Sequence, residues 1–181
     1  MGGNPWHYFT PYRVDLNSAL QALREQEFRA GRYGYSYWAN RWIPDLLTGN
    51  VAETFALLED TIEQPKPANE LIEEYGSIEA AIEVVLEQFG EGGTHSILDI
   101  MRLSEEPEMD AICTISESEL QQIFGTTQPT RDRVEAILVK EEEPESWQMF
   151  WDDIGRGEGR YIIIYQGGQP SELFFTGYSF D

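Results

Sequence analysis

Glutamates recur at every fourth position along a predicted helix that spans residues Ile78 to Phe89. Glu79, Glu83 and Glu87 fall on one face of this helix, and its apolar residues form a stripe on another. Like charges four residues apart weaken a helix by about 0.2–0.5 kcal/mol per pair. Each large apolar side chain that the helix buries contributes about 1.5–3 kcal/mol, which is more. The helix therefore tolerates this acidic row, which offers carboxylates to a basic partner.

A second acidic group lies in a loop between two predicted strands, at residues 94–101 and 110–115. Its members are Glu105, Glu106, Glu108 and Asp110. Both groups belong to residues 45–130, where 19 acidic residues face two basic ones and the net charge is −17. Such a surface repels nucleic acids and anionic membranes and attracts basic protein surfaces over a range set by salt. An equally open interpretation is a solvated surface that keeps the protein soluble.

The first 44 residues are different, because five arginines outweigh three acidic residues and lie among aromatic residues. Aromatic rings beside guanidinium groups stack bases and hold phosphates, so a nucleotide-like ligand is an alternative hypothesis. The residues predicted to bind it are Arg29, Arg32, Tyr33, Tyr37, Trp38 and Arg41. In the favoured interpretation the aromatic residues pack the core, and the arginines pair with the acidic middle of the chain, which neutralises part of the net charge of −21.

Other residue types that carry chemistry are scarce. His95 and Asp99, on a predicted strand, would share one face but lie about 13 Å apart, too far for one metal ion. Acid–base catalysis by His95 stays open, since histidine titrates in the useful range. Cys113 is the single cysteine, lies in an apolar run and is expected to be buried and inert. The sequence therefore predicts no metal site and no cofactor, and it favours a binding protein over an enzyme.

Turn and cap signals predict the elements that must position these residues. Predicted strands lie near residues 6–12, 94–101, 110–115, 161–165 and 172–178. Predicted helices begin near Asp15, Val51, Ser77, Ser116 and Thr130. Ser116 with Glu119 forms a capping box, and Gly167-Gly168 supplies the turn of a closing hairpin.

The arrangement of these elements predicts the fold class. Both strands of the closing hairpin are apolar on both faces, which indicates strands internal to a sheet. Strands at both ends and in the middle, with helices between them, predict an α+β protein. We expect a single domain over residues 1–181, with a largely antiparallel sheet of about five strands and four to six helices packed on it.

The expected location of the protein is the cytoplasm. The N-terminus lacks the basic and then apolar layout of a signal peptide. No apolar run approaches the roughly 20 residues that a membrane-spanning helix needs. We therefore expect no membrane association.

Several motifs resemble an uncharacterised family of small soluble bacterial proteins. These motifs are Tyr8-Phe9-Thr10-Pro11-Tyr12, Leu20-x-x-Leu23, Phe28-x-x-Gly31-x-Tyr33, Gly93-Thr94-His95-Ser96-Ile97-Leu98-Asp99-Ile100 and Phe175-Thr176-Gly177-Tyr178-Ser179. The resemblance implies a single intact domain and assigns no activity and no residue roles. It does not extend over residues 51–74, which are interpreted as a helical insertion.

Two functional hypotheses follow. The leading one is a non-enzymatic acidic binding protein that presents carboxylates to a basic protein partner, as inhibitors, immunity-type proteins and DNA mimics do. The alternative is a small enzyme or sensor that holds a nucleotide-like ligand near the N-terminus. A concave pocket lined by aromatic and arginine side chains would favour the alternative, and a flat acidic face without one would favour the first.

Overall fold

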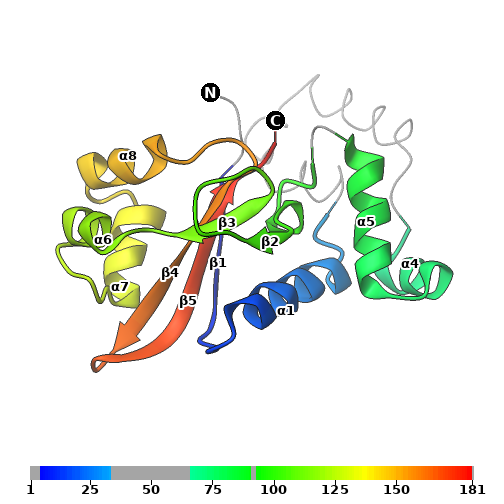
Figure 1. The fold of residues 1–181 in the computed structure, drawn as a ribbon, viewed down its shortest axis with the longest axis horizontal. Helices are drawn as coiled ribbons and strands as arrows, with labels where there is room; N and C mark the ends of the chain where they lie inside the picture. Colours follow the sequence, from blue (N-terminus) through cyan, green and yellow to red (C-terminus); the bar gives the residue numbers. More distant parts are fainter. Residues whose placement is uncertain (1–4, 34–65, 91–92, 181) are drawn as a thin grey trace, which may run out of the picture.

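The computed structural model describes residues 5–33, 66–90 and 93–180. Its centre is one sheet with the strand order β1-β5-β4-β3-β2 (Figure 1). The strands are β1 (Pro5–Pro11), β2 (Arg102–Leu103), β3 (Ala111–Thr114), β4 (Gly159–Gln166) and β5 (Gln169–Tyr178). β1, β5 and β4 are antiparallel neighbours, whereas β3 and β2 join the sheet in parallel. The α+β class is confirmed, but the sheet is mixed, because the helices between β3 and β4 return the chain to the same end.

Six α-helices lie in the described residues. They are α1 (Leu16–Arg29), α4 (Ala68–Tyr75), α5 (Ile78–Phe89), α6 (Glu117–Phe124), α7 (Arg131–Val134) and α8 (Pro144–Asp152). α7 continues as a π-helical turn, Glu135–Val139. The predicted caps are confirmed, since the side chains of Asp15, Ser77 and Ser116 accept hydrogen bonds from the first turns of their helices. None of these helices is long and apolar enough to cross a membrane.

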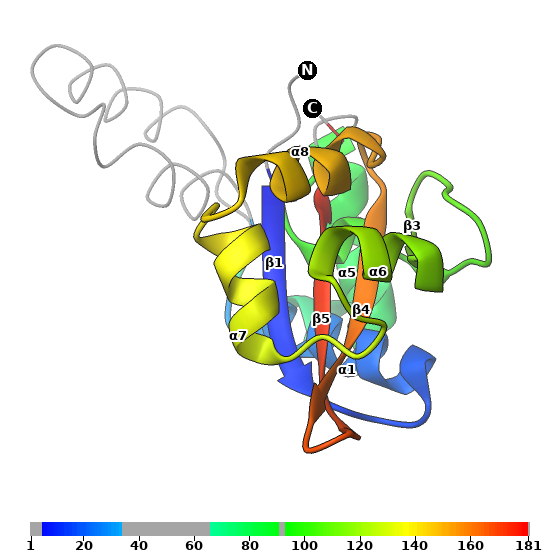
Figure 2. The same cartoon turned by 90° about the vertical axis from the view of Figure 1, so that its left-hand side faces the viewer.

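Helices cover both faces of the sheet (Figure 2). α6, α7 and α8 pack on one face, and α1 packs on the other. The closing hairpin supplies side chains to both cores, as its sequence predicted. On the face of α6–α8 these are Ile162, Ile164 and Phe174, and on the face of α1 they are Leu173, Phe175 and, partly buried, Tyr161 and Ile163. Burial on both faces follows from the central position of β4 and β5.

α4 and α5 form a helical hairpin at one end of the molecule (Figure 1). They enclose a third apolar cluster with the end of α1, in which Phe28, Leu71, Ile82, Val85 and Leu98 are buried. The described part of the expected insertion, residues 66–74, thus leads into α4 and packs into the fold. The rest of it, with the helix predicted from Val51, lies outside the described residues.

The strand predicted over residues 94–101 is wrong. This segment is a loop with a 3₁₀ turn at Ile97–Asp99, and β2 begins only at Arg102. His95 has a positive φ of 56°, which a strand does not allow. The Ser96 side chain caps the turn by accepting a hydrogen bond from the amide of Leu98. Short polar side chains thus offer the backbone an alternative to a sheet ladder.

Candidate functional site

The predicted acidic row lies on α5 and faces solvent. The apolar stripe of this helix buries Ala81 and Val85, which orients the row outward. Glu79, Glu83 and Glu87 are all exposed, and none forms an ion pair within the described residues. Within the part of the chain that the structure describes, their carboxylates therefore face solvent without an ion-pair partner.

α4 extends this negative charge. Its acidic residues, Glu70, Glu73 and Glu74, are exposed as well. Lys66 is the one basic residue in residues 66–90, and its Nζ lies 2.5 Å from Glu74 Oε2. This hydrogen bond raises the pKa of Lys66. We call α4 and α5 with their six glutamates the acidic hairpin, in which five carboxylates have no basic partner among the described residues.

A buried arginine lies beneath this hairpin. Arg24 of α1 donates a hydrogen bond from Nη1 to Gln21 Oε1 at 2.9 Å and another from Nη2 to the carbonyl of Leu98. Desolvation lowers its pKa, while the charges of Glu79 and Glu83 act in the opposite direction. The negative charges of these two glutamates and of Asp99 therefore favour the charged form of Arg24.

The second predicted acidic group is only partly available. Glu105 and Glu106 are exposed, but Arg102 Nη2 lies 2.6 Å from Glu108 Oε2 and 3.6 Å from Asp110 Oδ1. The hydrogen bond to Glu108 raises the pKa of Arg102. Both views show the loop between β2 and β3 apart from α5 (Figures 1 and 2). The two acidic groups are therefore separate surfaces.

The arginines of the alternative site are engaged within α1 and its end. Arg29 Nε lies 2.8 Å from Glu25 Oε1, and both side chains are exposed. Arg32 Nη2 lies 2.7 Å from Glu27 Oε1, and Glu27 is buried. Among the described residues, Arg29 and Arg32 thus pair with glutamates of their own segment, whereas the predicted pairing was with the acidic middle of the chain.

The one aromatic residue of this site that the structure describes belongs to the core. Tyr33 is buried and stacks on Phe28, with ring centroids 5.0 Å apart and planes at 11°. Its hydroxyl donates a hydrogen bond to the carbonyl of Lys66. Tyr37, Trp38 and Arg41 lie outside the described residues.

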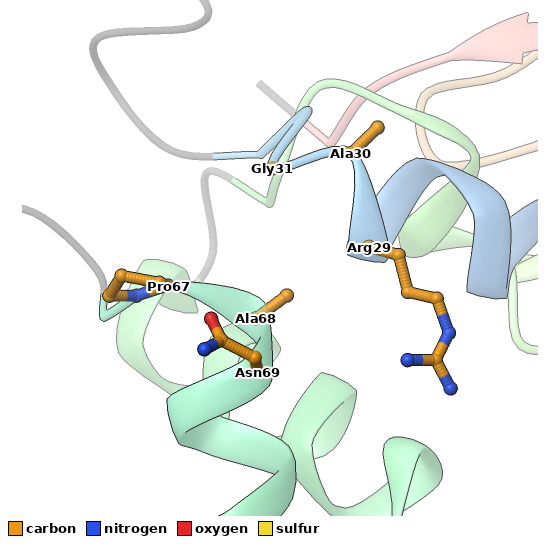
Figure 3. A pocket seen from close by; sticks show the side chains of 6 residues that line it. All are labelled: Arg29, Ala30, Gly31, Pro67, Ala68 and Asn69. Atoms are coloured by element: carbon orange, nitrogen blue, oxygen red, sulfur yellow. The ribbon is translucent and has the colours of Figure 1, made fainter.

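A shallow pocket opens between the end of α1 and the start of α4 (Figure 3). Its volume is about 290 Å³, and its lining residues are Arg29, Ala30, Gly31, Pro67, Ala68 and Asn69. The Arg29 guanidinium points away from Pro67, toward its ion-pair partner on α1 (Figure 3). Tyr33, the described aromatic residue of the predicted nucleotide site, does not line the pocket.

Sequence inspection missed a buried polar cluster in the Gly93–Asp99 loop. The Thr94 amide and hydroxyl both donate to Asp99 Oδ1, at 2.6 and 2.8 Å. The hydroxyls of Thr94 and Ser96 lie 2.8 Å apart, and both residues are buried. Asp99 Oδ2 makes no hydrogen bond within the described part of the chain. The sequence held one sign of this cluster, namely the polar residues Thr94, Ser96 and Asp99 beside apolar ones.

This loop also contacts the residues that follow β5. His95 Nδ1 lies 3.2 Å from Ser179 Oγ. Burial raises the pKa of Asp99 to about 6, although hydrogen bonds from Thr94 and the nearby amides of Ser96 and His95 oppose this shift. No group of three potential metal-ligating side chains occurs in residues 5–33, 66–90 and 93–180.

Cys113 lies on β3 and is buried, as expected. Desolvation raises its pKa and disfavours the reactive thiolate. Its predicted inertness therefore has a physical basis in its position in the sheet.

No protein-family model, no curated protein and no solved structure matches this chain. The resemblance to a family of small bacterial proteins stays a prediction. Arguments about function therefore rest on the geometry of the chain itself.

Proposed function

We propose that the protein is an acidic binding protein whose acidic hairpin docks on a basic surface of another protein. The observation that carries this proposal is the row Glu79, Glu83 and Glu87, exposed on one helix without ion-pair partners among the described residues. Charge that the chain does not neutralise itself is free to attract a partner of opposite sign.

The architecture supports this use of the hairpin. α5 is held by its own apolar cluster, so its acidic row projects from a rigid element. A rigid row loses less conformational freedom on binding than a flexible loop does. The separate loop with Glu105 and Glu106 adds long-range attraction, while Glu108 and Asp110 contribute less because Arg102 already pairs with them.

A capture experiment with two matched variants tests the proposal. The first variant carries Glu79→Gln, Glu83→Gln and Glu87→Gln, and the control carries Glu141→Gln, Glu142→Gln and Glu145→Gln, all exposed positions just before α8 or in its first turn. Both variants lose three charges, so they differ only in where the charge is removed. Each protein is immobilised and exposed to a lysate of its natural host at low and at high salt.

We expect the wild-type protein and the control to capture the same basic protein at low salt and to release it at high salt. The α5 variant should fail to capture it. Equal loss of capture in both variants would mean that overall charge, and not the acidic hairpin, governs binding. Full capture by the α5 variant would place the interface elsewhere.

The pocket beside Arg29 supports a second candidate, a nucleotide-like ligand. Its volume of about 290 Å³ is just below the range of about 300–1,000 Å³ for small-molecule sites, and the exposed Arg29 would have to leave its ion pair with Glu25 to hold a phosphate there. Calorimetric titration with ATP tests it. Heat of binding that Arg29→Ala abolishes would favour this candidate over the acidic hairpin.

A further inference from the structure

The Asp99 carboxylate and the Phe180 ring both lie against Gly93, and Phe180 follows the last residue of β5 by two positions. A Cβ atom built on Gly93 would lie 2.8 Å from Asp99 Oδ2 and 2.8 Å from Phe180 Cδ2. A Cβ atom built on Gly157 would lie 2.5 Å from Phe180 Cε1. The phenyl ring therefore fits between two glycines, one of which also lies against the unbonded carboxylate oxygen.

The two oxygens of this carboxyl group have unequal surroundings. Oδ1 accepts two hydrogen bonds from Thr94, whereas Oδ2 accepts none. This asymmetry is what a neutral carboxylic acid requires. Oδ1 would be the carbonyl oxygen that accepts the hydrogen bonds, and Oδ2 would carry the proton. An ionised carboxylate in the same place would hold charge on an oxygen without a donor, which is costly in a buried site.

We propose that Asp99, Phe180 and Ser179 form a proton-controlled latch, in which ionisation of Asp99 releases Ser179 and Phe180 from the Gly93–Asp99 loop. The released segment lies beyond the final ladder pair of β5, Pro5 with Tyr178. Opening breaks the contact of His95 with Ser179 and frees the phenyl ring, and it leaves every strand pair intact. Water then reaches the carboxylate.

In the closed state, charged groups on the neighbouring elements do not donate hydrogen bonds to Asp99 Oδ2 in place of that water. Arg24, on α1, attracts the carboxylate electrostatically but donates its hydrogen bonds to Gln21 and to the carbonyl of Leu98. On α5, Glu79 and Glu83 act on the same arginine and add negative charge.

The other two elements packed near the latch bring one ionisable group each. His95, in the loop itself, contacts Ser179 through Nδ1. Glu158, next to Gly157, accepts hydrogen bonds from the Gly155 amide and from Arg160 Nη2. Neither contributes a hydrogen-bond donor to Asp99 Oδ2, so the donors that favour the ionised carboxylate are Thr94 and the nearby amides of Ser96 and His95, which do not offset its burial.

The sign of the pH dependence follows from the raised pKa. The closed latch holds its proton up to about pH 6, whereas the open latch exposes a carboxyl group with an ordinary pKa near 3.8. The proton therefore favours the closed state fully at a pH below 3.8, and this advantage is lost as the pH rises through about 6. The opening equilibrium should rise about tenfold per pH unit between these values, about a hundredfold in total, and level off above pH 7.

Hydrogen exchange of the Gly157 amide reports this opening, because that amide divides its hydrogen bond between the carbonyls of Tyr178 and Ser179 and opening removes the Ser179 acceptor. The rate is compared with that of Asp99→Asn, which cannot ionise, at each pH from 4.5 to 8 and in 0.5 M NaCl. The ratio cancels the intrinsic pH dependence of exchange, and the salt screens surface charge. We expect the ratio to rise with pH and reach a plateau near pH 7, whereas a constant ratio would overturn the latch.

Carbon NMR of the Asp99 carboxyl group in the unaltered protein gives a readout that needs no folded variant. The expected midpoint is near pH 6, and a midpoint below 4.5 would overturn the proposal. Phe180→Ala should move the midpoint toward 4, because water then reaches the carboxylate. His95→Gln should leave the midpoint near 6, and its loss in that variant would assign the titration to the imidazole instead.

Discussion

At the scale of single residues, the core of this protein depends on close approaches that only particular side chains allow. Gly177 of β5 lies where a Cβ atom would collide with the carbonyl oxygen of Glu158 and would come within 2.5 Å of the Trp6 ring and 2.9 Å of the Gly159 Cα. Two of these three neighbours are backbone atoms of the adjacent strand segment, which cannot move without disturbing the sheet.

We therefore predict that Gly177→Ala lowers the free energy of unfolding by about 3 kcal/mol or more. Gly125→Ala is the control, since Gly125 has a φ of 74° and open space around it. That substitution should cost only the left-handed backbone penalty, about 1–2 kcal/mol. Urea unfolding measures both, and equal losses would show that the close approach at Gly177 carries no strain.

Two ion pairs at α1 and its end, Arg32 with Glu27 and Arg29 with Glu25, should differ in strength because only the first has a buried carboxylate. Removal of Arg32 leaves the carboxylate of Glu27, which is 1% exposed, without its charged partner. We predict that Arg32→Ala costs about 1–3 kcal/mol, because a buried acceptor loses its donor. Arg29→Ala breaks an exposed pair with Glu25 and should cost under about 1 kcal/mol. Thermal unfolding of both variants checks the order, which the reverse result would contradict.

Residue roles were the hardest to predict from sequence. The exposure of Glu79, Glu83 and Glu87 followed from helical spacing, because one apolar stripe fixes the opposite face. The burial of Asp99 did not, because Asp99 lies in a loop that packs against Ser179 and Phe180, which are distant in sequence and reach it only in the folded chain. The role of Tyr33 was equally hidden, because an aromatic residue in the sequence looks the same whether its ring stacks on a nucleotide base or on Phe28.

At the scale of elements, the hairpin of β4 and β5 holds the molecule together. β5 lies between β1 and β4, and its Phe174 and Phe175 enter the cores on opposite faces of the sheet. Its loss would therefore divide the sheet and expose both cores at once.

A chain that ends at Gly168 should consequently be unfolded or insoluble, since each large buried aromatic residue is worth about 3–5 kcal/mol against a typical stability of 5–15 kcal/mol. A chain that ends at Tyr178 keeps all five strands of the sheet and should fold. Circular dichroism and size-exclusion chromatography compare the two. A monomeric, cooperatively melting protein without β5 would show that the single-domain architecture is wrong.

Elements with local signals were predictable, and elements set by distant contacts were not. The capping box of Ser116 and Glu119 and the turn at Gly167 and Gly168 are encoded within a few residues, and each lies where the sequence placed it. The parallel pairing of β3 with β4 joins strands that three helices separate, so no local pattern reports it. The loop at residues 93–99 was mistaken for a strand because its side-chain hydrogen bonds outweigh its apolar composition.

At the scale of the whole molecule, charge is unevenly placed on the structure. The net charge is −21, and part of it is neutralised internally through pairs such as Arg102 with Glu108 and Arg131 with Glu172. The acidic hairpin lies at one end of the molecule (Figure 1), and most of its charge has no ion-pair partner among the described residues. A basic partner should therefore be drawn toward that end as it approaches.

The rate of association with the captured basic partner tests this account most directly. Stopped-flow mixing at several ionic strengths compares the wild-type protein with the α5 variant (Glu79→Gln, Glu83→Gln, Glu87→Gln) and the control variant (Glu141→Gln, Glu142→Gln, Glu145→Gln). We predict that the α5 variant associates at least about tenfold more slowly at low salt, with a flatter dependence on salt, while the control stays close to wild type. Identical rates and salt dependence for all three proteins would contradict a docking role for the acidic hairpin.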